Sequence, residues 1–370
     1  MKCFFFLSAC AFVACVGGDD NAAQDGGAET GTDGTVVSDG SAETSSDASS
    51  SMDVEADAPR PVPKAVGDFD WAGVADGTGD GPIAYDAQGN LFFAFRFYYP
   101  ITFNATQYTS AGTYDVILSK WDPSGKIIWA RQYGGASDDE ILALAVDPAG
   151  DVYATFLAAS PTFSFGFGSN VTFTHVGTYT DGFVVKLKGS NGDGVWLANY
   201  TKPNEQYLAC GQLAYGGGKL GVSCFSYQGM SLVKASDDTP LTLSCLECGG
   251  TSSQYNNIYV ASLDPTSGKA NWGNVVAADN QTTATSIAVD SKGAVDMGFS
   301  SFGTIVHDPT NSVNWTYAGV KGSIALIVKL AGTNGAGIWF KQFTDGTTNN
   351  NNQTEPGGVA VDGNDDVVFG

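Results

Sequence analysis

Residues 120–129 have the sequence KWDPSGKIIW, and residues 262–272 repeat the phrase as SLDPTSGKANW. A short run of Asp, Pro, Ser and Gly between two β-forming runs is typical of a tight turn between strands. The recurrence predicts a repeat protein made of β-strands. We expect this turn to join the outer strand of one sheet to the first strand of the next, with its tryptophan packed between the sheets.

Five tryptophans mark the repeat, at spacings of 58, 67, 76 and 67 residues: Trp71, Trp129, Trp196, Trp272 and Trp339. Near-equal spacing of this kind indicates a repeat array. We expect these tryptophans to be structural anchors of the repeated units.

A second segment recurs after each tryptophan, as in LAVDPAGDVYATF from Leu144 and IAVDSKGAVDMGF from Ile287. Two apolar runs around a turn of Asp, Gly or Asn predict a hairpin of buried strands. An aspartate stands at the same turn position in four units, where a carboxylate can accept backbone N–H groups: Asp86, Asp147, Asp290 and Asp362. The third unit has Gly216 instead.

A further β-rich segment completes each unit, as in GFVVKLKG from Gly182 and ALIVKLAG from Ala325. Four antiparallel strands per unit, with no helical periodicity between them, predict an all-β fold and specifically a β-propeller over residues 67–370. Four complete blades and part of a fifth are visible. Surplus aromatic pieces, PITFNATQYT and TFSFGFGSNVTFTH, predict an extra hairpin or long loop at the blade rim.

The phrase WARQYGGASDDEILALAVDPAGDVYATF followed by DGFVVKLK resembles the bacterial propeller-type repeats known as SBBP repeats, over essentially residues 68–370. That resemblance implies a propeller scaffold and binding or cell-surface roles. SLDPTSGKANW is also similar to the tryptophan-docking phrase of quinoprotein dehydrogenases and of the outer-membrane assembly lipoprotein propeller. Adjacent cysteines, which the quinoprotein enzymes use, are absent from this sequence, whereas the assembly-scaffold interpretation stays open.

The N-terminus, MKCFFFLSACAFVAC, has one lysine, an apolar run and a cysteine preceded by small residues. This is typical of a secretory signal and too short for a membrane span of about 20 residues. It resembles a bacterial lipoprotein signal over residues 1–15, with Cys15 as the predicted lipidation site and Cys10 as the alternative. A plain secretory signal is the remaining possibility.

Residues 16–66 are rich in Gly, Ser, Thr and Asp, and up to Arg60 they contain eleven acidic residues and one basic residue. Such a segment buries too little apolar surface to order itself, so we expect a disordered tether. It carries −10 of the formal net charge of −22. The acidic balance argues against nucleic acid as a partner, and membrane contact is expected through the lipid anchor alone.

Four cysteines lie beyond the signal, all in the third unit: Cys210, Cys224, Cys245 and Cys248. If the hairpin turns at Gly217, Cys210 faces Cys224 across the ladder at a separation that permits a disulfide. Two structural disulfides are expected in an oxidising compartment. A zinc site or a redox-active pair at the C-x-x-C motif is the alternative.

Other candidate motifs favour structure over chemistry. His175 and His307 fall in rim segments of different units, and no nucleophile motif accompanies them. DGTGDG at 76–81 lacks the bidentate glutamate of an EF-hand loop. FFAFRFYY at 92–99 could stack on sugars if exposed, but we expect it to be a buried third strand.

Together these features predict a noncatalytic binding or scaffold module for an unknown protein or polysaccharide, lipid-anchored outside the cytoplasm of a Gram-negative bacterium, in the outer membrane or at the cell surface. No catalytic residue, cofactor or metal site is predicted. The alternative is a propeller hydrolase, lyase or quinoprotein-like oxidoreductase with its site at the central channel. Since the fifth unit stops at Gly370 within a strand, we also expect the sequence to be a fragment or an early-terminated chain.

Overall fold

The computed structural model describes residues 81–166, 171–175, 180–201, 208–226, 230–234, 241–243, 257–278, 282–301, 305–307, 324–343 and 357–370. All of them belong to the larger of two units into which the chain divides, the unit that contains Trp71–Gly370. These residues form antiparallel strands and turns and contain no helix, so none could cross a membrane as a helix. The predicted signal segment 1–15 and tether 16–66 lie outside the described residues.

Each of the first four units contributes four antiparallel strands to one sheet. In the first sheet the order is β1 (Ile83–Tyr85), β2 (Leu91–Phe97), β5 (Asp115–Trp121) and β6 (Ile127–Tyr133). The second sheet repeats it with β7 (Asp139–Val146), β8 (Val152–Ala158), β11 (Asp181–Leu187) and β12 (Gly194–Thr201). The all-β prediction with four strands per unit is therefore confirmed.

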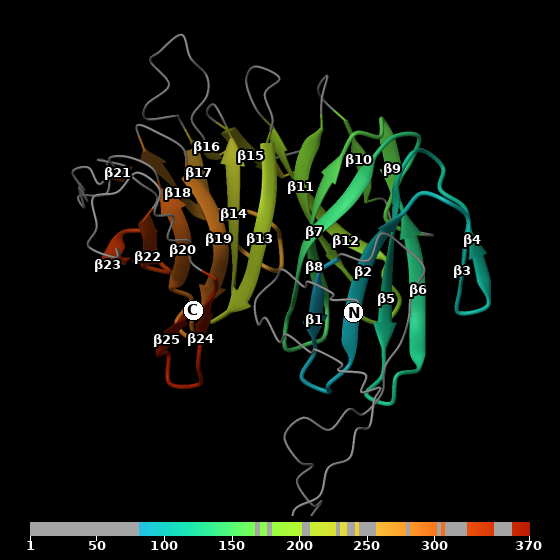
Figure 1. Cartoon of the computed structure of the whole chain (residues 1–370), viewed down its shortest axis with the longest axis horizontal. Helices are drawn as coiled ribbons and strands as arrows, with labels where there is room; N and C mark the ends of the chain where they lie inside the picture. Colours follow the sequence, from blue (N-terminus) through green and yellow to red (C-terminus); the bar gives the residue numbers. More distant parts are fainter. Residues whose placement is uncertain are drawn as a thin grey trace, which may run out of the picture. The chain divides into compact units, whose positions relative to one another are not determined.

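The next two sheets follow the same order (Figure 1). The third contains β13 (Leu208–Gly216), β14 (Lys219–Ser226), β17 (Asn257–Leu263) and β18 (Ala270–Ala278), and the fourth β19 (Thr282–Val289), β20 (Val295–Ser301), β22 (Ile324–Leu330) and β23 (Gly337–Phe343). A final hairpin, β24 (Val359–Val361) with β25 (Val367–Phe369), corresponds to the first two strands of a fifth sheet.

The predicted position of the turn in KWDPSGKIIW is wrong. KWDPSGKIIW is a turn inside the first sheet, because β5 pairs with β6 in a register that places Lys120 opposite Trp129. Each tryptophan strand therefore closes its own sheet instead of opening the next one. For the same reason the aromatic run at 92–97 lies in the second strand of its sheet and not in the third.

The four-strand order gives every sheet two distinct ends. The turns between its first and second strands and between its third and fourth strands lie at one end, which we call the turn end. Figure 1 shows several of these turns at the lower edge of the sheets. The longer connections, and the links from one sheet to the next, lie at the opposite end, which we call the loop end.

The surplus segments are inserted between the second and third strands of each sheet, and in the first two units they form the extra hairpins that the sequence predicted. These hairpins are β3 (Ile101–Phe103) with β4 (Thr106–Tyr108) and β9 (Thr162–Ser164) with β10 (Thr172–Thr174). In the third unit, β15 (Met230–Lys234) pairs with β12 of the preceding sheet and with β16 (Leu241–Leu243). In the fourth, β21 (Ile305–His307) pairs with β18. These last two insertions cover the outer edge of the sheet before them, which protects that edge from unwanted pairing.

The core lies between consecutive sheets. Phe92 and Trp129 of the first sheet pack with Ile141 and Val152 of the second in one apolar cluster. Equivalent clusters join the second sheet to the third, the third to the fourth, and the fourth to the β24–β25 hairpin. Since both faces of the second and third sheets are covered in this way, their central strands are buried almost throughout, as in β11 and β17.

Candidate functional site

Three of the repeated tryptophans make the same contact at the turn end. Each indole Nε1–H donates a hydrogen bond to a backbone carbonyl in the turn between the third and fourth strands of the following sheet. The pairs are Trp129 to Gly189 at 3.0 Å, Trp196 to Pro265 at 3.1 Å and Trp272 to Gly332 at 2.9 Å. Each tryptophan thus joins its sheet to the next.

A glycine in each of these turns lies under the ring of the docked tryptophan. A Cβ atom on Gly268 would fall 2.6 Å from the Trp196 ring, and one on Gly335 would fall 2.4 Å from the Trp272 ring. Both glycines also have positive φ, +75° and +71°, a region that other residues rarely adopt. Gly268 of SLDPTSGKANW is therefore required by the approach of the tryptophan as well as by the turn.

The four turn aspartates share one hydrogen-bond pattern. In each, Oδ1 accepts the backbone N–H groups two and four residues later, which closes the turn between the first two strands. For Asp147 these donors are Ala149 at 3.0 Å and Asp151 at 2.9 Å. The same pair of contacts is made by Asp86, Asp290 and Asp362.

In three sheets the second carboxylate oxygen of the turn aspartate binds a lysine from the third strand. The Nζ to Oδ2 distances are 3.0 Å for Lys120 with Asp86, 3.0 Å for Lys186 with Asp147, and 2.8 Å for Lys329 with Asp290. Each lysine stands directly opposite its sheet's tryptophan in the strand register. The aspartates were predicted from the sequence and the lysines were not, although the recurrence of a lysine in the third-strand segments of three units was the available signal.

Burial and ion pairing shift the pKa values of these carboxylates in opposite directions. Burial raises the pKa of Asp147, but hydrogen bonds from Lys186 and Tyr153 outweigh it and leave the pKa below its ordinary value of 3.8. The pKa of Asp290 is lowered in the same way by its hydrogen bond with Lys329. Both carboxylates are therefore charged and paired with their lysines, an arrangement that stabilises the turn.

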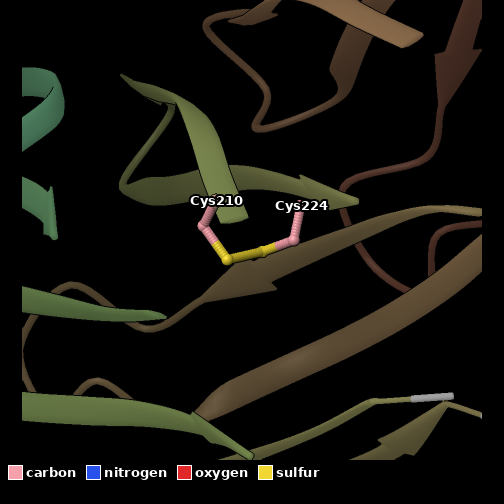
Figure 2. Close-up of a disulfide and its surroundings, with 2 residues drawn as sticks. All are labelled: Cys210 and Cys224. Carbon is pink, nitrogen blue, oxygen red and sulfur yellow. A yellow bond between two sulfur atoms is a disulfide. The ribbon is translucent and has the colours of Figure 1, made fainter. Parts of the chain in front are cut away.

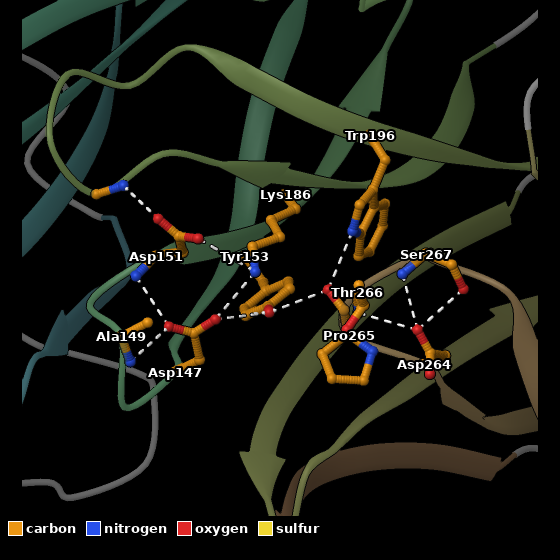
Figure 3. Close-up of polar contacts among 11 residues, drawn as sticks. Asp147, Ala149, Asp151, Tyr153, Lys186, Trp196, Asp264, Pro265, Thr266 and Ser267 are labelled. Carbon is orange, nitrogen blue, oxygen red and sulfur yellow. Dashed lines mark hydrogen bonds and ion pairs between the residues drawn. The ribbon is translucent and has the colours of Figure 1, made fainter.

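The second sheet has the most extended form of this network (Figure 3). Lys186 lies between Asp147 and Asp151, at 3.0 and 3.2 Å, with its Nζ 5.0 Å from the centre of the Tyr153 ring. The Tyr153 hydroxyl donates to Asp147 at 2.9 Å and also contacts the Pro265 carbonyl at 3.2 Å. That carbonyl accepts the Trp196 indole as well, so the ion pair and the tryptophan joint form one network across two sheets.

The third sheet lacks this network. Gly216 replaces the turn aspartate, and Ser262 occupies the register position of the lysine, opposite Trp272. A Cβ atom on Gly216 would lie 2.0 Å from the Val289 carbonyl oxygen of the next sheet, so this turn has no room for any side chain. The close approach of β13 to β19 explains the departure from the repeat.

A disulfide joins Cys210 to Cys224 in this same sheet, as Figure 2 shows, so the predicted bond is confirmed. The register differs from the expected one, because the turn contains two residues, Gly217 and Gly218, between the paired Gly216 and Lys219. A register shift between Ala209 and Gln212 then brings the cysteines opposite each other. Cys245 and Cys248 lie outside the described residues.

The loop end carries a different set of polar residues. Asp115 and Asp139 begin β5 and β7 and are buried, and burial raises the pKa of both carboxyls despite their hydrogen bonds. Ser160 donates to Asp139 at 2.5 Å and Gln132 to Asp115 at 2.5 Å. These hydrogen bonds lie beside the segment 134–138, which connects the first sheet to the second.

His175, after β10, lies with its Nδ1 3.1 Å from Asp181 Oδ2 at the start of β11. The side chain of His307 lies outside the described residues. Trp71 lies outside them too, as does Asp76, the first residue of DGTGDG. The described residues contain no group of three or more His, Cys, Asp or Glu side chains arranged to hold a metal ion.

Exposed aromatic residues gather at the loop end of the first sheet. The run FFAFRFYY divides there: Phe92, Phe95 and Phe97 are buried, whereas Tyr98 is 44% and Tyr99 74% exposed. The buried interpretation therefore holds for the strand, and the exposed one for the two tyrosines that follow it.

One further surface feature lies between the fourth sheet and the β24–β25 hairpin. This groove, about 410 Å³ in volume, is lined by Trp339, Lys341 and Phe343 on one side and by Asp365, Val367 and Phe369 on the other. Lys329 also reaches it, held by Asp290 and Asp296 at 2.8 Å each.

Comparison with known proteins identifies no family. No family model matches the chain, and no curated protein matches it. Among solved structures, the chain is similar to a variant of the Synechocystis apocarotenoid oxygenase, with a TM-score of 0.32 and 10% identity over 69% of this chain and 56% of that one. It is also similar to the quinohemoprotein alcohol dehydrogenase ADHIIG from Pseudomonas putida HK5, with a TM-score of 0.27 and 8% identity over 69% of this chain and 51% of that one.

The chain spans little more than half the length of these two structures. Both similarities are too low to transfer a family or an activity, and the function has to be argued from the chain's own residues.

Proposed function

We propose that the chain is a β-propeller of the bacterial cell envelope, anchored by a lipid at Cys15, that works as a noncatalytic binding or scaffold module for protein or glycan. Cys10 is the alternative anchor. Four successive sheets with a common strand order, each packed face to face on the next, support the propeller. The resemblance to SBBP repeats supports an envelope role.

One observation carries the binding role: the two ends of the sheets are built differently. The turn end repeats the same tryptophan and glycine contacts from sheet to sheet, and the same aspartate contacts in every unit except the third, which makes it a fixed frame. The loop end carries insertions that differ in length and sequence between units. Variable loops on a rigid frame are the usual construction of a recognition surface.

The charged groups at the turn end also favour a scaffold over an enzyme. Lys120, Lys186 and Lys329 are each held in ion pairs with carboxylates. A lysine fixed in this way supports the turn instead of acting on a substrate.

Binding is tested by site-directed crosslinking in intact cells. A photoreactive amino acid replaces Gln107, which is exposed in the inserted hairpin β3–β4, or Gln88, which is exposed in the turn between β1 and β2. We expect discrete crosslinked envelope products from position 107 and none from position 88. Equal labelling at both positions, or none at either, would refute recognition at the loop end.

The anchor is tested separately by metabolic labelling with an alkyne fatty acid in a Gram-negative host. We expect the label on the wild-type chain and on Cys10→Ser, and its loss with release of the protein from the membrane fraction in Cys15→Ser. The reverse result would assign the anchor to Cys10. Label on neither cysteine would leave a plain secretory signal.

A further inference from the structure

The exposed tyrosines at the loop end are placed by the strand register. Because Phe97 pairs with Asp115, the next residues along the two antiparallel strands, Tyr98 and Tyr114, stand opposite each other. Their ring centres are 5.5 Å apart, and Tyr99 packs edge-on against Tyr98 at 4.7 Å. The three rings form one cluster, which we call the tyrosine cluster.

The position of Tyr99 is unusual for an aromatic residue. It is 74% exposed, more than any other large hydrophobic side chain of the described residues. Tyrosine has an apolar ring face and a polar hydroxyl, so an exposed ring suits a ligand that is itself both apolar and polar.

A charged pair adjoins the tyrosine cluster. Arg96 lies on β2 two residues before Tyr98, and its guanidinium is 5.0 Å from the centre of the Tyr114 ring. Its Nη1 is 3.4 Å from Oε2 of Glu140 on the neighbouring sheet, and both side chains are 36% exposed. The side chains of Arg96 and Glu140 are therefore partly exposed beside the rings.

We propose that the tyrosine cluster, with Arg96 and Glu140, binds a neutral polysaccharide. The C–H face of a sugar ring stacks on an aromatic ring, while its neighbouring hydroxyls match a planar guanidinium and a carboxylate. The pair carries no net charge, and the chain as a whole carries −22, so an anionic polymer is disfavoured. This inference deepens the proposed binding function and rests on it.

The test is calorimetric titration of the full chain, purified in detergent, with cellohexaose, maltohexaose, laminarihexaose and chitohexaose, and with hexagalacturonate as the anionic comparison. We expect at least one neutral hexasaccharide to bind and hexagalacturonate not to bind. Tyr99→Ala should weaken binding about tenfold, as loss of an aromatic anchor does, whereas Tyr99→Phe should keep the affinity within about twofold because the ring remains.

The matched control is Tyr85→Ala. Tyr85 is also exposed, at 61%, but it lies at the turn end of the same sheet, so its loss should leave the affinity unchanged. Because Tyr99 is at the surface, Tyr99→Ala should unfold at the same urea concentration as the wild type, which separates a binding defect from misfolding.

The outcomes distinguish this site from the general function. A hexasaccharide that binds Tyr99→Ala as tightly as the wild type would overturn the site and leave glycan binding intact. If no hexasaccharide binds but a protein is crosslinked from position 107, the polysaccharide proposal is overturned and the proposed binding function is supported. Failure of both experiments would overturn both proposals.

Discussion

The second and third sheets are joined to the following sheet in the same way, but their first hairpins are held together by different interactions. Both dock a tryptophan on the following sheet, Trp196 on Pro265 and Trp272 on Gly332. The second sheet adds the ion pair of Lys186 with Asp147, whereas the third has glycine and serine at those positions and a disulfide from Cys210 to Cys224. The tryptophan joint is common to both, and the means of fixing the first hairpin differs.

The difference shows that the lysine and the aspartate are exchanged as a unit. Val289 leaves no room for a side chain at Gly216, so the third sheet cannot have the turn aspartate. A lysine in the place of Ser262, which is fully buried, would then be an unpaired charge in a dry site, at a cost of several kcal/mol. One steric contact between sheets thus accounts for both changes.

The largest effect is expected from breaking the pair in the second sheet. Lys186→Met leaves Asp147 buried without its cation, which should lower the free energy of unfolding by about 3–5 kcal/mol. Urea unfolding at pH 7 measures it. Lys188→Met, two residues further along and exposed, is the control and should change little. Equal losses in the two variants would show that the ion pair does not support the fold.

Removal of the disulfide from the third sheet should have the next largest effect. The bond spans 14 residues, and a loop of that size is worth about 3 kcal/mol. Cys210→Ala combined with Cys224→Ala should therefore unfold at lower urea concentration than the oxidised wild type. Dithiothreitol should destabilise the wild type and not the double variant. A wild type that is indifferent to dithiothreitol would mean that the bond contributes nothing.

Much of this comparison could be predicted from the sequence. Repetition predicted the number of strands per unit and the equivalence of the tryptophans, and the spacing of two cysteines around a hairpin turn predicted the disulfide. The assignment of each tryptophan strand to its own sheet was missed, because a turn such as KWDPSGKIIW has the same appearance within a sheet as between two sheets. Only hydrogen-bond register separates the two cases.

The lysine pairs were missed for a related reason. Lys186 is 39 residues from Asp147, and nothing local indicates that β11 will place it beside the turn of β7 and β8. The exposure of Tyr98 and Tyr99 was equally hidden, since FFAFRFYY is one apolar run in sequence. The strand ends at Phe97, and that boundary decides which aromatic residues are buried.

The exchange of the pair is tested by making the second sheet resemble the third. Lys186→Ser alone leaves Asp147 unpaired, and Asp147→Gly removes that unpaired carboxylate. The double variant should therefore lose less free energy of unfolding than the sum of the losses in the two single variants. Coupling between contacting groups is typically up to about 3 kcal/mol, and we expect about 2 kcal/mol for this pair. A double-mutant cycle in urea measures it. Additive losses would show that the two residues act independently and that their joint absence from the third sheet has another cause.

The smallest expected effect sharpens the contrast between the turn end and the loop end. The pKa of Asp115 is raised by burial, so this carboxyl stabilises the fold when protonated, and that contribution is lost as the pH rises above its ordinary value of 3.8. Asp115→Asn should therefore stabilise the protein at pH 7 and flatten the fall in stability between pH 4 and 7.

Asp122 at the turn end provides the comparison of opposite sign. Hydrogen bonds from Ser124 and Lys126 lower its pKa, so its contribution is present at pH 7 and is lost as the pH falls below about 4. Asp122→Asn should slightly destabilise the protein at pH 7 and have a smaller effect at pH 3. Urea midpoints at pH 3, 5 and 7 compare the two variants. If both shift the midpoint at pH 7 in the same direction, burial does not decide the protonation of Asp115.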